Sequence, residues 1–135
     1  MGESPVNLCS YRLEKATKDL EGAQVLLDKN LYAQSLNRSY YSIFHSVRAL
    51  LAFTKFDSKK HSGIIAYFNQ NYIKTEIFSY EYFKIINNAE RVRIQSDYND
   101  FYVATKQQAE EQLENAKKIL RGIKDFINQQ YLTNS

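Results

Sequence analysis

The scarcity of glycine and proline constrains the fold of this chain more than any other feature. Only four Gly and one Pro occur among 135 residues, whereas about sixteen of the two together would be average for this length. Tight hairpins and connecting loops draw heavily on both residues. The scarcity therefore excludes an all-β sandwich and a set of domains joined by flexible linkers, and it favours helices.

Apolar residues at three- and four-residue spacing predict five helices and no strand. The expected helices cover residues 10–28, 32–54, 59–73, 80–97 and 106–131. Ser10 and Ser58 are the expected N-caps of the first and third helices, because their hydroxyls can accept a free backbone N–H. Thr105 and Gln108 have the spacing of a capping box that starts the last helix.

The last predicted helix carries two apolar series that repeat every seven residues and form a narrow seam. The series consist of Ala109, Ala116 and Ile123, and of Leu113, Leu120 and Ile127. Such a seam is suited to packing along another long antiparallel helix. The expected fold is all-α, an up-and-down helical bundle of four main helices plus one shorter helix.

The length indicates one domain, and the single cysteine indicates a reducing compartment. We expect residues 1–135 to form a single domain with its core at about 10–131. Cys9 is the single cysteine, so the chain has no internal disulfide, and a cytoplasmic location is expected. There is no membrane-spanning apolar run and no signal-peptide pattern. The net charge of +3 permits a nucleic-acid partner without requiring one.

The predicted helix at 32–54 has two different faces. At 100° per residue, Tyr40, Ile43 and Val47 fall within about 40° of Leu36 and define its core face. The opposite face, about 120–200° from Leu36, carries Arg38, Tyr41, His45 and Arg48. A helix with an apolar face and a second face of aromatic and cationic residues has to bury both. We therefore expect a homodimer, with Arg38 and His45 near its twofold axis.

Arg38 and His45 have the chemistry to act on a phosphodiester. A guanidinium binds phosphate through two parallel hydrogen bonds, and an imidazole can move a proton near neutral pH. RNA supplies its own nucleophile, the 2′-hydroxyl, so neither a metal nor another cofactor is expected. Tyr41 is a candidate for stacking on a base. An arginine and a histidine seven residues apart also occur on many ordinary helix surfaces, and that alternative stays open.

Four sequence segments resemble the HEPN family (higher eukaryote and prokaryote nucleotide-binding domains), and the likeness covers about residues 10–131. The longest is NRSYYSIFHSVRALL at 37–51. The others are KHSG at 60–63, the segment from Phe68 to Lys74-Thr75, and RIQSDY at 93–98. The resemblance is to the small stand-alone prokaryotic members, and it implies an α-helical bundle that is usually dimeric.

The resemblance also implies a function. Many members carry Arg, four to six residues and then His, and cleave RNA without metal across the dimer interface; Arg38 and His45 match the long form. Arg38 would bind the phosphate, and His45 would move a proton during 2′-hydroxyl attack, which leaves a cyclic phosphate. Prokaryotic members often pair with a nucleotidyltransferase as toxin and antitoxin. The alternative is a non-catalytic module that binds a nucleotide or docks that partner.

Arg93, Asp97 and Tyr98 are further candidates for contacts with the substrate. Arg93 and Asp97 lie four residues apart, which an ordinary intrahelical ion pair also explains. Tyr98 would then pack at the helix end. His61, among lysines and serines at a helix start, is interpreted as a solvated residue. Two histidines and scattered carboxylates provide no metal-site spacing.

Overall fold

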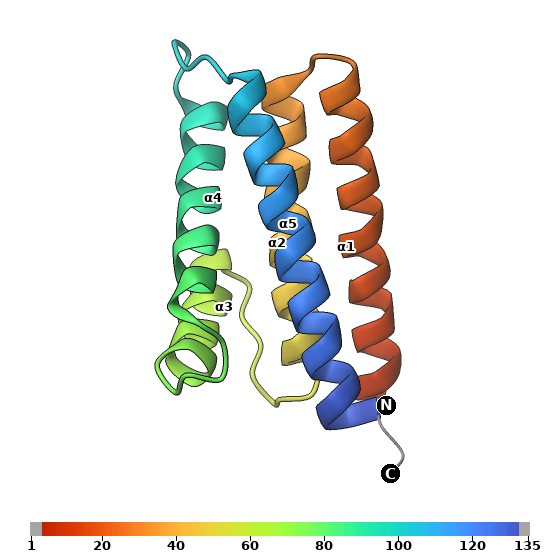
Figure 1. Cartoon of the computed structure of the whole chain (residues 1–135). Coiled ribbons are helices and arrows are strands. Elements are labelled where there is room, and N and C mark those ends of the chain that lie inside the picture. Colours follow the sequence, from red (N-terminus) through yellow and green to blue (C-terminus); the bar gives the residue numbers. More distant parts are fainter. Residues whose placement is uncertain (1–3, 133–135) are drawn as a thin grey trace.

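The computed structural model describes residues 4–132, and the regular structure in that range is entirely helical (Figure 1). Its elements are α1 (Pro5–Asp28), α2 (Tyr32–Leu51), α3 (His61–Phe68), the π-helical turn η1 (Asn69–Ile73), α4 (Tyr80–Tyr98), α5 (Lys106–Ile127) and the π-helical turn η2 (Asn128–Leu132). The long helices alternate in direction along the chain, with α3 and η1 crossing the base of the bundle. The predicted all-α, up-and-down bundle is confirmed. None of the described helices is long and apolar enough to cross a membrane.

The helix ends differ from the prediction at three places. The first helix begins at Pro5, not Ser10, because Ser4 accepts the N–H of Asn7 and proline at the first position is already set for a helix. The second ends at Leu51. The third begins at His61 after Lys60, so Ser58 is not its N-cap and instead accepts the backbone N–H of Lys60. The capping box at the start of α5 is confirmed.

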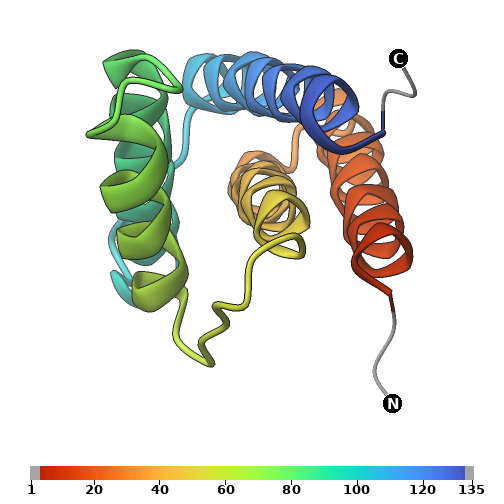
Figure 2. The ribbon, with the colours of Figure 1, turned by 90° about the horizontal axis from the view of Figure 1, so that it is seen from below.

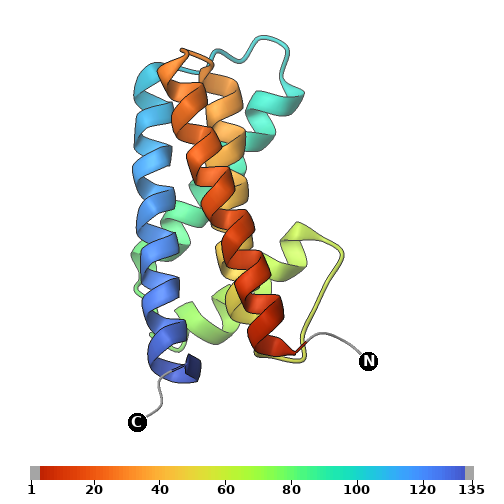
Figure 3. The same cartoon turned by 90° about the vertical axis from the view of Figure 1, so that its right-hand side faces the viewer.

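Helix α2 occupies the middle of the bundle. Seen along its axis, α1, α5 and α4 surround it on three sides and leave the fourth side open (Figure 2). The turned view shows α1 and α5 running side by side, with α3 projecting from the base (Figure 3). The predicted core face is confirmed, since Leu36, Tyr40, Ile43 and Val47 are each at most 2% exposed. Phe44, about 80° from Leu36 around the helix axis, is buried as well.

Small residues bring α1 and α2 together. The contacting face of α2 carries four serines that are fully buried: Ser35, Ser39, Ser42 and Ser46. Ser42 Oγ donates to the carbonyl of Ala16, and Ser35 Oγ donates to the carbonyl of Ala23, both at 2.8 Å. Because carbonyls of α1 accept these two hydroxyls, both are buried at little cost. Ser46 Oγ donates instead to the carbonyl of Ser42 within α2, and Ser39 Oγ has no partner among the described residues. Apolar periodicity alone did not predict this interface.

The seven-residue seam of α5 is confirmed, because all six of its apolar residues are buried. The seam packs on α1, which runs antiparallel to α5, and also on α2, which runs in the same direction as α5 (Figure 1). Packing on two helices at once explains why α5 needs two apolar series. The result is a rigid support behind α2, opposite its open side.

Candidate functional site

The open side of α2 carries most of the residues that the sequence singled out. Five side chains there are neither buried nor fully exposed, and we call them the open strip: Asn37, Arg38, Tyr41, His45 and Arg48. The 100° spacing of α2 puts them on one face, and the core on the other three sides of the helix fixes the orientation of that face. The open strip is therefore presented to ligands by the most buried helix of the bundle.

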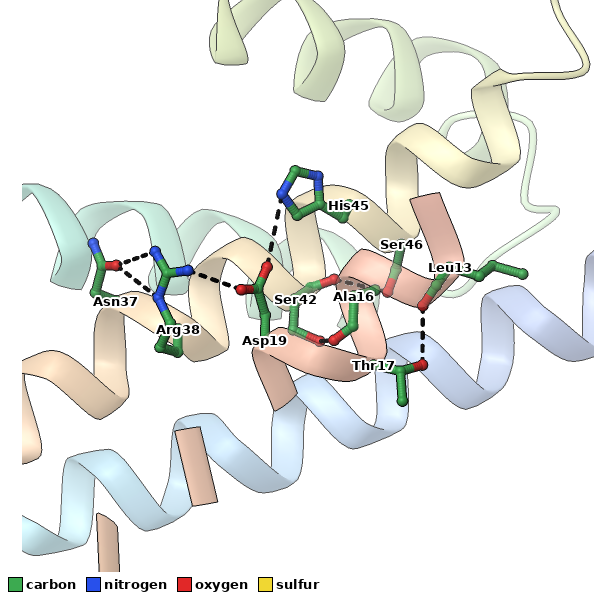
Figure 4. Close-up of polar contacts among 9 residues, drawn as sticks. All are labelled: Leu13, Ala16, Thr17, Asp19, Asn37, Arg38, Ser42, His45 and Ser46. Atoms are coloured by element: carbon green, nitrogen blue, oxygen red, sulfur yellow. Dashed lines mark hydrogen bonds and ion pairs between the residues drawn. The ribbon is translucent and has the colours of Figure 1, made fainter. Parts of the chain in front are cut away.

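Asp19 of α1 lies between the two central residues of the open strip (Figure 4). One carboxylate oxygen accepts a hydrogen bond from Arg38 Nη1 at 2.8 Å. The other lies 3.7 Å from His45 Nε2, which is longer than a hydrogen bond. Asn37 Oδ1 accepts two further bonds from the Arg38 guanidinium. Arg38 is thus held in place by a carboxylate of α1 and by the side-chain amide oxygen of its neighbour.

His45 is held as a neutral imidazole. Its side chain is 17% exposed, and burial, followed by the charges of Lys15, Arg48, Arg38 and His61, lowers its pKa to about 4. Its Nδ1 is buried without a hydrogen-bond partner in the described part of the chain. An imidazole that is unprotonated at neutral pH can accept a proton immediately, which is what a general base requires.

Arg93 of α4 reaches the open strip from the other side. Its guanidinium lies over the ring of Tyr40 at 4.5 Å and within 6.0 Å of the ring of Tyr41. It also pairs with Asp97 at 3.4 Å, as the four-residue spacing predicted. The ion pair and the contact with the open strip therefore coexist. Tyr98 is 78% exposed. The expectation that it packs at the helix end is therefore wrong.

Arg48 closes the lower end of the open strip. Its guanidinium pairs with Asp57 at 3.1 Å in the segment that leads to α3. Its backbone carbonyl accepts a bond from Arg12 of α1 at 2.8 Å. These contacts tie α1, α2 and the connecting segment together beside His45, and they leave Arg48 partly exposed.

His61 is not the solvated residue that its neighbours suggested. Its ring is half-buried, and its centroid lies 4.0 Å from that of Phe44. Its Nδ1 lies 3.0 Å from the hydroxyl of Tyr40. The lysines and serines beside it in the chain gave a misleading signal, because its contacts come from a helix about 20 residues earlier.

Two adjoining cavities follow the open strip and share Arg38. The first, of about 390 Å³, is lined by Lys15, Lys18, Asp19, Arg38, Tyr41 and His45. The second, of about 440 Å³, is lined by Leu26, Ala33, Gln34, Asn37, Arg38, Ser96 and Asp97. The first combines three cationic side chains with a tyrosine ring, a combination suited to a phosphate next to a base. Among the described residues, no three His, Cys, Asp or Glu side chains come close enough together to hold a metal ion.

Comparison with known families identifies the bundle. The HEPN domain family matches this sequence over residues 9–126. The chain belongs to the HEPN family. The resemblance in the four sequence segments is thereby confirmed, and the match includes the open strip, Asp19, His61 and Arg93.

Relatives of this HEPN chain come from archaea and bacteria. The protein named "Putative toxin MJ0142" of Methanocaldococcus jannaschii is 35% identical over 115 residues, which cover 85% of this chain and 78% of that protein. A UPF0332 protein of Thermotoga maritima is 28% identical over 120 residues, or 89% of this chain and 91% of that protein. The crystal structure of an archaeal HEPN homologue matches with a TM-score of 0.63 and 22% identity, covering 88% of this chain and 97% of that one, and shows the same fold.

In this HEPN bundle, sequence reasoning found Arg38, Tyr41, His45 and Arg48 by helix geometry, and found Arg93 and Asp97 by family resemblance. It did not find Asp19. The signal available for Asp19 was weak, since a lone aspartate on an amphipathic helix normally faces solvent. What marks it is the pairing across two helices, which needs the register between α1 and α2.

Proposed function

We propose that this HEPN protein is a metal-independent endoribonuclease and the toxin component of a toxin–antitoxin pair. Arg38 binds the scissile phosphate, and His45 Nε2 removes the proton from the 2′-hydroxyl. The 2′-oxygen then attacks phosphorus, and the products carry a 2′,3′-cyclic phosphate and a 5′-hydroxyl. The observation that carries the proposal is a neutral imidazole beside a guanidinium on the open strip.

The roles follow from the surroundings of each group. Lys15 and Lys18 line the same cavity as Arg38 and His45, so the site attracts a polyanion. Arg38 is 39% exposed on its side chain, and its pairing with Asp19 is weak enough for a phosphate to replace it. Tyr41, Arg48, Arg93 and Asp97 lie around the two central residues and would contact the nucleotides on either side; Tyr98 would contact a base farther along the strand.

The name of the archaeal relative supports the toxin role, and the family supports a homodimer and a nucleotidyltransferase as the antitoxin partner. The non-catalytic alternative uses the same open strip to bind a nucleotide or to dock the nucleotidyltransferase. It differs from the ribonuclease in one respect: it needs Arg38 but no proton transfer at His45.

The decisive experiment incubates purified protein with single-stranded RNA in EDTA and analyses the cleaved ends. We expect cyclic-phosphate ends from the wild type, and a loss of about 10²–10⁴-fold in rate for His45→Ala. Arg38→Ala should lose a similar amount, while Arg91→Ala, which removes an exposed arginine of α4, should cleave like the wild type. Absence of cyclic-phosphate ends, or equal cleavage by His45→Ala, would reject the ribonuclease and leave the binding module.

A second arm of the experiment uses the carboxylate that occupies Arg38. Replacing Asp19 by Asn removes the negative charge beside the guanidinium of Arg38. RNA should then bind up to about fivefold more tightly in fluorescence anisotropy, the gain expected if the partly exposed ion pair is worth about 1 kcal/mol. Glu21→Gln is the matched control, because it removes the same charge from an exposed position of α1 outside the cavity. Equal gains from both variants would mean that net charge alone sets the affinity.

A further inference from the structure

Cleavage of RNA by 2′-hydroxyl attack needs two proton transfers, and the proposed function assigns only one of them. The base removes a proton from the nucleophile. Unless a second group protonates it, the 5′-oxygen has to depart as an alkoxide, which is a poor leaving group. The inference below rests on the proposed function and concerns that second group.

The second imidazole of the chain lies beside the open strip. His45 and His61 both pack against the ring of Phe44, with centroid distances of 5.7 Å and 4.0 Å. Both also flank the ring of Tyr41, at 6.1 Å and 5.6 Å. Although they come from α2 and from the start of α3, the two imidazoles therefore share one aromatic support.

The orientation of His61 is fixed by Tyr40. The Tyr40 hydroxyl lies 3.0 Å from His61 Nδ1, and the two rings are stacked. Tyr40 is itself 1% exposed and lies beneath the guanidinium of Arg93. Because Nδ1 is engaged by a buried phenol, Nε2 is the ring nitrogen that remains to serve a substrate, and its position is set by the core.

We propose that His61 is the general acid of this ribonuclease and that His45 is its general base. His45 Nε2 takes the proton of the 2′-hydroxyl as the bond from the 2′-oxygen to phosphorus forms. The bond from phosphorus to the 5′-oxygen breaks, its electron pair stays on that oxygen, and His61 Nε2 supplies the proton. Exchange with water returns each imidazole to its starting state, so no other reactant is consumed.

The charges around the two imidazoles couple their protonation. Burial lowers the pKa of His61, and the charges of Arg93 and Arg48 lower it further. A charge on His61 is also among the causes that lower the pKa of His45. The two rings therefore resist being protonated together, which favours a neutral His45 when His61 carries a proton. An incoming phosphate offsets the positive arginines and makes a protonated His61 more favourable.

A change of leaving group tests the assignment. The dinucleotide uridylyl-3′,5′-adenosine needs a protonated leaving oxygen, whereas uridine 3′-(4-nitrophenyl phosphate) releases a stable phenolate. We expect His61→Gln to lose about 10²-fold or more on the dinucleotide and less than about threefold on the nitrophenyl ester. His45→Gln should lose about 10²-fold or more on both, because both substrates need the base.

A further variant and a folding control distinguish a loss of proton transfer from a loss of structure. Tyr40→Phe keeps the aromatic packing and removes the partner of Nδ1, so it should lower kcat on the dinucleotide and leave KM and the nitrophenyl ester unchanged. Circular dichroism and urea unfolding show whether each variant is folded. An equal loss on both substrates by a folded His61→Gln, or no loss on the dinucleotide, overturns the assignment and leaves the proposed function intact. A wild type that cleaves neither substrate overturns both.

Discussion

At the scale of single residues, His45 couples the proposed chemistry to the stability of the fold. Its pKa is about 4 in the folded protein and about 6.5 in an unfolded chain. Below pH 6.5 the unfolded chain therefore binds the extra proton, and stability falls as the pH is lowered towards 4. Between pH 7 and pH 5 this amounts to about 2 kcal/mol.

Urea unfolding at the two pH values measures this effect. The wild type should lose about 2 kcal/mol more on acidification than a His45→Gln variant, which has no imidazole at that position. His61 adds a loss of the same sign, because its pKa is also lowered. Asp19 acts in the opposite direction, since burial raises its pKa. The His45→Gln variant keeps His61 and Asp19, so their contributions cancel in the comparison. Equal losses in the two proteins would show that His45 titrates normally.

Sequence reasoning succeeded for residues whose partners lie on the same helix and failed for those whose partners do not. Arg38 and His45, seven residues apart, lie on one face of any regular α-helix, and so do Arg93 and Asp97, four residues apart. Asp19 gains its role from residues 19 or more positions away. His61 was assigned to solvent from its neighbours in the chain, although Tyr40 and Phe44 decide its environment. The missing information in both cases is the register between elements.

At the scale of the element, two glycines of long helices test the packing in opposite directions. A Cβ on Gly122 of α5 would overlap the hydroxyl and Cζ of Tyr82. A Cβ on Gly22 of α1 would come no closer than 3.8 Å to the side chain of Arg38, an ordinary contact. Gly22→Ala should therefore stabilise the protein by about 0.5–1 kcal/mol, and Gly122→Ala should destabilise it by about 1–3 kcal/mol.

A double mutant shows whether Tyr82 is the cause. In a Tyr82→Ala background the added methyl group has room, so the cost of Gly122→Ala should disappear, as urea midpoints will show. A cost that persists in that background would place the strain in α5 itself.

Helix α2 illustrates what periodicity can and cannot establish for an element. Its apolar stripe was predicted correctly because four large residues repeat at helical spacing. Its serine stripe was missed, since serine is normally a surface residue. Two of these serines, Ser35 and Ser42, are satisfied in the core because carbonyls of α1 accept their hydroxyls. The small residues of α1, Cys9, Ala16 and Ala23, repeat every seven positions and could have indicated that a second helix approaches closely there.

At the scale of the molecule, the bundle closes around α2 on three sides and leaves the open strip uncovered. The sequence-based case for a homodimer assumed that only a second copy could cover the aromatic residues on the second face of α2. Tyr41 does not require a second copy, because its ring already contacts Tyr40, His61 and Arg38 of the same protomer. If two copies meet, we expect the open strip to form the contact, because Asp19 offsets the charge of Arg38 there.

Light scattering at micromolar concentration tests the dimer. We expect twice the protomer mass of 15.8 kDa. A residue near a twofold axis meets its own copy, so Asn37→Arg on the open strip should place two like charges together and shift the mass towards that of one protomer. Asn87→Arg, on the exposed side of α4, adds the same charge elsewhere and should leave the mass unchanged. A wild-type mass near that of one protomer would reject the dimer, and equal behaviour of the two variants would move its interface away from α2.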